Sequence, residues 1–120
     1  MNSAARAYAA AANQRSPREQ EADVFRRASG ALMAARRGGS LQQVKAISDN
    51  RRLWLTVADL MRDPLNALPQ DLRASIVSIS IVVQREMERQ QPDLDFLIAI
   101  NENIAAGLSV QVQGSQQGDL

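Results

Sequence analysis

The chain has 120 residues, which is enough for one domain built around one modest hydrophobic core. Its 14 Lys and Arg residues against 13 Asp and Glu leave a net charge of +1, so the charge balance does not favour nucleic acid binding. The sequence has no Cys, which excludes disulfides and thiolate chemistry, and no His, the commonest general base and metal ligand. We therefore expect a protein that is not an enzyme and that has no cofactor and no metal site.

The apolar stretches of this sequence are short. A membrane-spanning helix needs about 18 or more consecutive apolar residues, and every such stretch here is interrupted by charged or polar residues. Residues 1–14 are rich in alanine, but they include Arg6 and lack a long leucine-type core, so they differ from a secretory signal. With the absence of Cys, this predicts a cytoplasmic protein without membrane insertion. Residues 4–12 are a candidate for a short N-terminal helix.

The first principal helix is predicted at residues 17–37. Ser16 is placed for an N-cap, Pro17 suits the first helical position, and Glu19 completes the spacing of a capping box. The sequence RRGG at residues 36–39 ends the pattern. Small and apolar residues recur at three- and four-residue spacing, which predicts one buried stripe. This stripe consists of Ala22, Phe25, Ser29 and Leu32.

The second helix is predicted at residues 41–62, where Ser40 and Gln43 repeat the capping-box spacing. Its second half is apolar nearly all round, so it should be covered on more than one side. One face carries Val44, Ile47, Trp54, Ala58 and Met61, and Leu41, Leu53, Leu55, Val57 and Leu60 widen it. The only tryptophan could be a core residue or a contact residue. Because its large area dominates a small core, we predict that Trp54 is core.

The third helix is predicted at residues 70–90, after an irregular connection imposed by Pro64 and Pro69. Its β-branched run at residues 75–83 would favour a strand on propensity alone. However, apolar residues keep helical spacing over the whole segment, and the sequence offers no second strand to pair with it. The positions concerned are Leu72, Ile76, Ile79, Val83 and Met87.

The last helix is predicted at residues 93–107, after Pro92 and with Gly107 as its stop. Its stripe consists of Leu94, Leu97, Ile98, Asn101, Ile104 and Leu108. Residues 109–120 are polar with little to bury, so we predict a disordered tail there. The expected fold class is therefore all-α: a small single-domain bundle of four principal helices at residues 1–108, with a possible short N-terminal helix.

The patterns that could carry chemistry are weak. Asp93 and Asp95 are two positions apart, and such carboxylates point away from each other on a helix. The glycines of RRGG lack the Lys and Ser or Thr that follow in a phosphate-binding loop. The sequence RRLW at residues 51–54 resembles an RNA contact, but one Trp, one Tyr and two Phe form no stacking platform. We predict no tight nucleic acid binding.

Surplus apolar surface on the helices suggests a groove for a partner helix. Successive helical positions point about 100° apart, so one packing face cannot take Leu53, Trp54 and Leu55 together. The predicted core contains Phe25, Leu32, Trp54, Ile76, Ile79 and Leu97. The predicted partner-binding residues are Leu53, Val57, Leu60, Ile81 and Val82.

Three segments resemble the flagellar biosynthesis regulatory protein FlaF family of alphaproteobacteria over about residues 8–108. They are SPREQEADVFRRASGALMAAR, NRRLWLTVADLMRDPLNALPQDLRASIVSISIVV and FLIAINENIAAGL. The most specific positions are Asn50, Leu53 and Trp54, followed by Pro64, Asn66, Leu68, Pro69, Leu72 and Arg73.

This resemblance implies a small cytoplasmic all-α factor without catalytic activity that promotes flagellin synthesis or export. It also implies that flagellin is bound directly, through its amphipathic terminal helices, and that a translational repressor called FlbT is opposed. A flagellin-binding chaperone is therefore the first hypothesis. The alternative is a post-transcriptional regulator of flagellin mRNA that acts with or against an FlbT-like repressor. A structural subunit of the secretion apparatus fits a short chain less well.

Overall fold

The computed structural model describes the backbone of residues 16–118 and the side chains of residues 16–110. This part of the chain forms four helices, α2 (Pro17–Arg36), α3 (Ser40–Arg62), α4 (Gln70–Met87) and α5 (Leu94–Gly118), and it contains no strand. The all-α prediction is confirmed, including the helix over the β-branched run of α4. The possible N-terminal helix at residues 4–12 lies outside the described residues.

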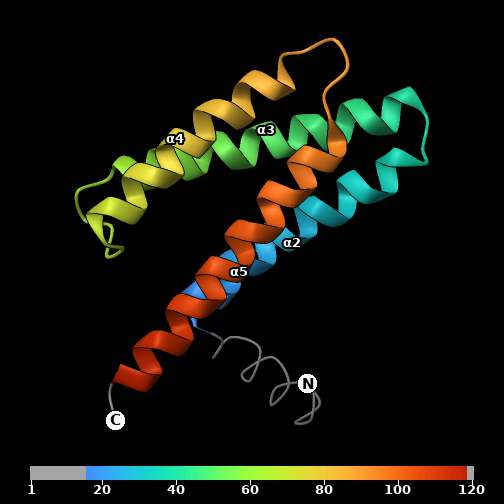
Figure 1. Ribbon diagram of the computed structural model, residues 1–120. Helices are drawn as coiled ribbons and strands as arrows, with labels where there is room; N and C mark the ends of the chain where they lie inside the picture. Colours follow the sequence, from blue (N-terminus) through green and yellow to red (C-terminus); the bar gives the residue numbers. More distant parts are fainter. Residues whose placement is uncertain (1–15, 119–120) are drawn as a thin grey trace, which may run out of the picture.

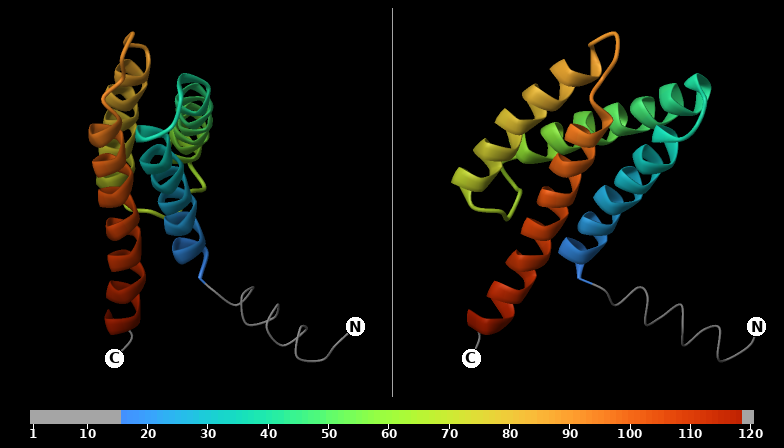
Figure 2. Two further views of the ribbon diagram at one scale, coloured as in Figure 1. Left: turned by 90° about the vertical axis from the view of Figure 1, so that its right-hand side faces the viewer. Right: turned by 45° about the vertical axis from the view of Figure 1, so that its right-hand side comes forward.

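The four helices form two pairs, with α2 alongside α5 and α3 alongside α4 (Figure 1). The pairs meet near the α2–α3 turn and the α4–α5 connection, and they diverge toward their other ends, so the molecule has the outline of a V (Figure 2). Seen from the side, α4 and α5 make one layer, and α2 and α3 make the other. The loop between α3 and α4 and the start of α2 therefore lie at the open end of the V.

The start of α2 follows the sequence prediction, whereas the start of α3 differs from it. Ser16 caps α2, because its Oγ accepts a hydrogen bond of 3.1 Å from the backbone N–H of Glu19. In α3, Ser40 is already helical and Gly39 takes the N-cap position without a side-chain bond. The Gly39 carbonyl accepts from the N–H of Gln43 at 3.1 Å, so the backbone alone closes the first turn.

The end of α5 differs most from the prediction. The expected stop at Gly107 is wrong, because α5 continues to Gly118. A glycine inside a helix costs only about 1 kcal/mol, which neighbouring contacts can offset. Here Arg26 of α2 donates a hydrogen bond of 2.9 Å to the Ser109 hydroxyl, beyond the glycine. Figure 1 shows α5 running along α2 toward the open end of the V.

The core is centred on Trp54, whose side chain is fully buried. Its ring lies 5.6 Å from that of Phe25 in an edge-to-face arrangement, which aromatic pairs prefer. Leu32, Ile76 and Leu97 are buried in the same cluster, whereas Ile79 is only partly buried and packs against it.

Two buried asparagines accompany the tryptophan. Asn101 of α5 accepts a hydrogen bond of 2.8 Å from the indole N–H of Trp54 and donates one of 2.8 Å to Asn50 of α3. The Asn50 amide in turn donates to the sulfur of Met87 on α4 at 3.4 Å. Because buried polar groups are costly unless they are hydrogen-bonded, this network fixes how α3, α4 and α5 meet.

Candidate partner-binding groove

An apolar groove lies where the two helix pairs diverge. Its inner part is a cavity of about 90 Å³ lined by residues from all four helices. A second cavity of about 350 Å³ continues between α4 and α5. Ile76, Ile104 and Leu108 line both, so we treat them as one feature and call it the wedge groove. The other lining residues are Glu21, Phe25, Val57, Leu60, Met61, Asn66, Leu72, Asn103, Gly107 and Val110.

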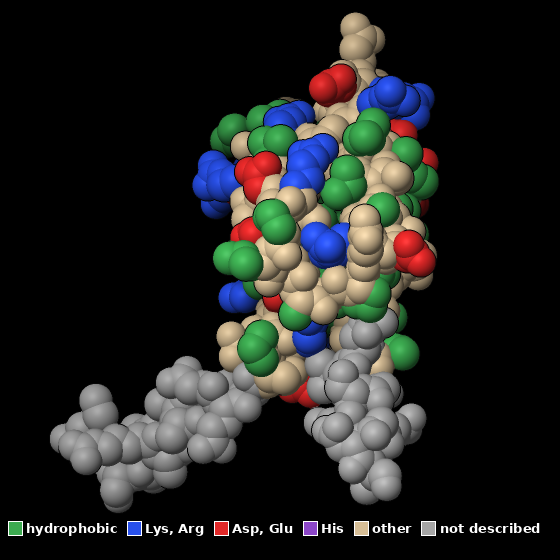
Figure 3. Space-filling model, turned by 90° about the vertical axis from the view of Figure 1, so that its left-hand side faces the viewer, with side chains coloured by type: hydrophobic (Ala, Val, Ile, Leu, Met, Phe, Trp, Pro, Cys, Tyr) green, Lys and Arg blue, Asp and Glu red, His purple; other side chains and the backbone are tan. Residues whose placement is uncertain are grey.

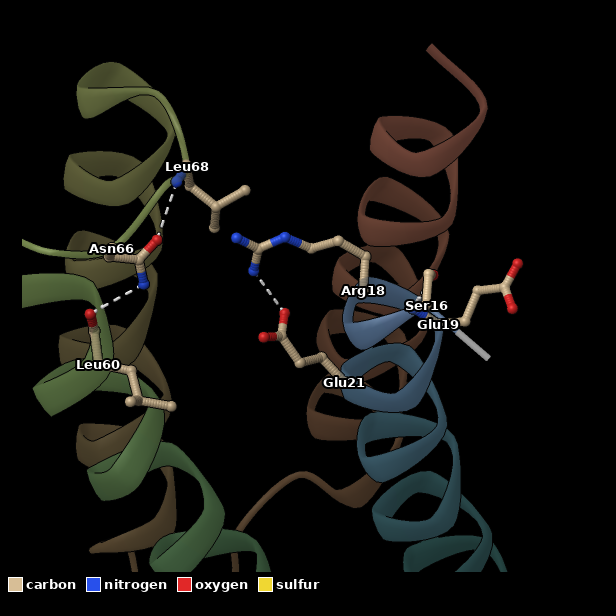
Figure 4. A network of polar contacts seen from close by, with 7 residues as sticks. All are labelled: Ser16, Arg18, Glu19, Glu21, Leu60, Asn66 and Leu68. Carbon is tan, nitrogen blue, oxygen red and sulfur yellow. Dashed lines mark hydrogen bonds and ion pairs between the residues drawn. The ribbon is translucent and has the colours of Figure 1, made fainter. Parts of the chain in front are cut away.

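The loop between α3 and α4 holds one wall of the wedge groove in place. Pro69 ends this loop, and Asn66 makes the central contacts (Figure 4). The Asn66 amide donates a hydrogen bond of 2.9 Å to the carbonyl of Leu60, and its Oδ1 accepts one of 2.9 Å from the N–H of Leu68. These bonds tie the end of α3 to the residues that precede α4, and so position Leu60 beside Ile76 in the groove.

Arg73, in the first turns of α4, strengthens the same connection. Its guanidinium donates to the carbonyls of Leu68 and Asp63, both at 3.2 Å. A cation at the C-terminus of a helix also interacts favourably with the helix dipole, here that of α3. The loop is therefore held by one asparagine and one arginine that are both present in the family-like segment of the sequence.

The opposite wall is formed by the first turns of α2. Arg18 and Glu21 form an ion pair of 2.6 Å, and the Arg18 side chain extends from α2 toward Leu68 (Figure 4). Glu21 itself lines the wedge groove next to Phe25. The mouth of the groove thus has a polar rim, while its floor is apolar.

The predicted partner-binding residues fall in three places. Val57 and Leu60 line the wedge groove, but Val57 is buried whereas Leu60 is 49% exposed. Leu53 is partly buried and lines a separate open depression with Val24 and Arg52. Ile81 and Val82 are exposed on α4, 46% and 49% respectively, and neither lines the groove.

The contribution of α5 to the groove was not predicted from the sequence. Ile104 and Leu108 were expected on a buried stripe, and both do face the interior, but they line the groove from its α5 side. Val110 lies beyond the predicted helix end and is 61% exposed. No apolar periodicity pointed to Val110, because it lies two positions after Leu108, on a different side of the helix, and shares its side with Asn103 and Gly107.

Apolar side chains are also exposed outside the groove. Figure 3 shows one face of the molecule, on which hydrophobic side chains alternate with Arg and with Asp or Glu. Such scattered apolar residues are normal on protein surfaces, unlike a concave apolar groove. The large exposed side chains outside the wedge groove are Val24, Met33, Leu41, Val44, Leu55, Leu65, Ile81 and Val82.

The acidic residues have structural roles where their contacts are defined. Glu86 pairs with Arg89 at 3.1 Å and accepts a bond from the N–H of Asp93, while Asp93 caps the start of α5 through the N–H of Phe96. Within residues 16–118, we find no cluster of three or more acidic side chains suited to a metal ion. In the same range, no helix combines the length and apolarity needed to cross a membrane.

Comparison with known proteins identifies the family. A family model described as "Flagellar protein FlaF" matches residues 4–108, which include the whole wedge groove except Val110. No curated protein and no solved structure gives a significant match. A match over this share of the sequence, together with the all-helical fold, shows that the chain belongs to the FlaF family of flagellar proteins.

Proposed function

We propose that this protein is a non-catalytic, cytoplasmic factor that binds unassembled flagellin and covers apolar helical segments of it, thereby promoting flagellin secretion and flagellum assembly. The observation that carries the proposal is the wedge groove, an apolar depression lined by all four helices in a member of a flagellar protein family.

The shape of the groove favours a helix as the bound element. It runs between two diverging helix pairs, and a helix packed there would contact α4 on one side and α5 on the other. Amphipathic helices bind such grooves by inserting apolar side chains spaced three or four residues apart. Leu72, Ile76, Ile104 and Leu108 provide apolar contacts from both walls.

The side chains that line the groove suit the covering of apolar segments better than catalysis. Its floor consists of aliphatic side chains and Phe25, and the polar side chains that line it are Glu21, Asn66 and Asn103. Terminal segments of unassembled flagellin are amphipathic, as the family resemblance implies, and would expose apolar residues until assembly. Burying these residues in the groove would lower their tendency to aggregate.

Co-purification of the full chain with flagellin tests the proposal. Full-length flagellin and versions truncated at either end should be compared, and loss of binding with one truncation is expected to identify the bound segment. Isothermal titration calorimetry should show a negative heat-capacity change, because apolar surface is buried. The proposal fails if purified flagellin does not bind; tight binding of flagellin mRNA instead would favour the regulatory alternative.

A further inference from the structure

We propose that one side of α4, which we call the outer face, is a dimerisation surface on which α4 of a second copy of this chain packs in the antiparallel direction. The outer face consists of Asp71, Ala74, Ser78, Ile81, Val82 and Arg85. Each of these residues is exposed and lies about 120° or more around the helix axis from Ile76, which is buried in the core. The inference goes beyond the proposed function and does not depend on it.

The outer face lacks charge along its central part. The exposed residues of α4 between Asp71 and Arg85 are Ala74, Ser75, Ser78, Ile81 and Val82. A helix on a protein surface normally presents charged side chains on the side away from the core. Ile81 and Val82 therefore belong to a continuous strip of small and aliphatic side chains, and such a strip favours a second helix packed against it.

The spacing of the outer face suits a contact between two helices. The steps between Asp71, Ala74, Ser78, Ile81 and Arg85 alternate between three and four residues. Residues at this spacing stay on one side of a helix, where they can contact a second helix along their whole length. From Asp71 to Arg85 this contact is about 21 Å long.

The charges at the two ends of the outer face are complementary to each other. Asp71 lies in the first turn of α4 and Arg85 in its last turn, each seven positions from Ser78. In a symmetric antiparallel pair centred on Ser78, Asp71 of either copy lies opposite Arg85 of the other copy. Within residues 16–110, neither side chain forms an ion pair. Antiparallel pairing thus gives an ion pair at each end, whereas parallel pairing would place like charges together.

The side-chain sizes are complementary in the same arrangement. Ala74 of one copy lies opposite Val82 of the other, and Ser75 lies opposite Ile81, so that a small residue meets a larger one each time. Ser78 lies at the symmetry axis, where a small side chain lets the helices approach closely. Its hydroxyl donates a hydrogen bond of 3.2 Å to the carbonyl of Ala74 in its own helix, so it keeps a partner when it is buried.

The dimer leaves the wedge groove accessible. Leu72 and Ile76 line the groove from the inner side of α4, whereas the outer face lies on the opposite side of that helix. Each copy in the dimer therefore keeps its own groove. Because a single pair of helices makes the contact, the interface is small, and we expect a dimer that dissociates on dilution.

Sedimentation equilibrium of the full chain, without flagellin, measures the dimer. The mean mass should rise from that of one chain toward that of two as the protein concentration is raised to about 1 mM, where weak complexes form. The mass of one chain at every concentration would overturn the proposal.

Charge reversal tests the contact itself. Asp71→Arg and Arg85→Glu each place like charges at both ends of the pair, so each variant alone should dimerise at least about tenfold more weakly than the unmodified chain. Mixed in equal amounts, the two variants should form a mixed dimer. The introduced arginine then lies opposite the introduced glutamate, and Arg85 of the first variant lies opposite Asp71 of the second. If the mixture dimerises no better than its components, the antiparallel pairing is wrong.

Asp59→Arg and Arg52→Glu are the matched controls, because they make the same charge changes at exposed positions of α3. Both should dimerise as the unmodified chain does; weakening equal to that of the α4 variants would trace the effect to net charge and overturn the proposal. Circular dichroism checks the folding of each variant. If a charge reversal loses the helical signal, Ser78→Lys replaces it, because it brings like charges together at the axis and should weaken the dimer similarly.

Discussion

The indole N–H of Trp54 donates a 2.8 Å hydrogen bond to the side-chain oxygen of Asn101, and both residues are fully buried. This contact joins α3 to α5, which belong to different helix pairs. It lies between the closed end of the V and the wedge groove, because Asn101 precedes the groove residue Ile104 by one turn. The hydrogen bonds of Trp54, Asn101 and Asn50 thus fix how the two helix pairs that line the groove are placed relative to each other.

Trp54→Ala should unfold a marginally stable domain. Removing a large buried aromatic side chain costs about 3–5 kcal/mol, a large fraction of typical domain stability. Thermal melts followed by circular dichroism should show loss of the cooperative transition at growth temperature. If the variant stays folded and loses flagellin binding alone, Trp54 is a contact residue and the assignment to the core is wrong.

Asn101→Ala should also destabilise the protein, through a different mechanism. It leaves the indole N–H of Trp54 and the Oδ1 of Asn50 without their partner, and each unsatisfied buried group costs about 1–3 kcal/mol. Asn103→Ala is the matched control, because Asn103 is exposed on the same helix. Urea denaturation should give a lower midpoint for Asn101→Ala alone; equal midpoints for the two variants would contradict the role given to the network.

Leu60→Asp should weaken flagellin binding without unfolding the domain. Leu60 lines the wedge groove and is 49% exposed, so a carboxylate there meets solvent in the free protein but an apolar surface in the complex. Val82→Asp is a control with the same exposed fraction, on the outer side of α4. Pull-down with flagellin should separate the two. Equal binding by both variants, or a greater loss with Val82→Asp, would contradict binding at Leu60. A greater loss with Val82→Asp would place the binding surface on the exposed face of α4 that carries Val82.

Ending the chain after Val110 should leave the melting temperature near that of the full chain. The described core lies within residues 22–108, and the removed segment is polar. This variant tests whether residues 111–120, which are helical as far as Gly118, contribute to the stability of the folded domain. A large drop in melting temperature would show that the end of α5 contributes to stability through its packing along α2.

RNA binding by the isolated protein should be weak and strongly dependent on salt. A net charge of +1 keeps the affinity low, and the buried Trp54 and Phe25 rings cannot stack on bases. Any remaining binding would come from contacts between Arg and phosphate, which salt weakens. Electrophoretic mobility shifts with flagellin mRNA at low and physiological salt would measure this. Tight, sequence-selective binding at physiological salt would contradict it.

Much of the fold was determined by local sequence. Ser16 and Pro17 define the start of α2, and the spacing of Ile76, Val83 and Met87 makes α4 a helix despite its β-branched residues. These features act within one or two turns, so they can be recognised without knowing what the segment contacts. The burial of Phe25, Leu32 and Leu97 follows from the same periodicity, since a single stripe on each helix must face the interior.

Only the tertiary structure decided which surplus apolar residues border a groove. Leu53 and Leu60 lie on the same apolar helix, yet Leu60 faces the gap between the helix pairs and Leu53 lies beside α2 residue Val24. The continuation of α5 past Gly107 likewise involves a distant partner, since Arg26 and Ser109 are far apart in sequence. Periodicity determines the direction in which a side chain points on its own helix. The angle at which two helix pairs diverge depends on contacts between distant residues, such as Trp54 with Asn101, and this angle decides whether that side chain meets a neighbour or an open groove.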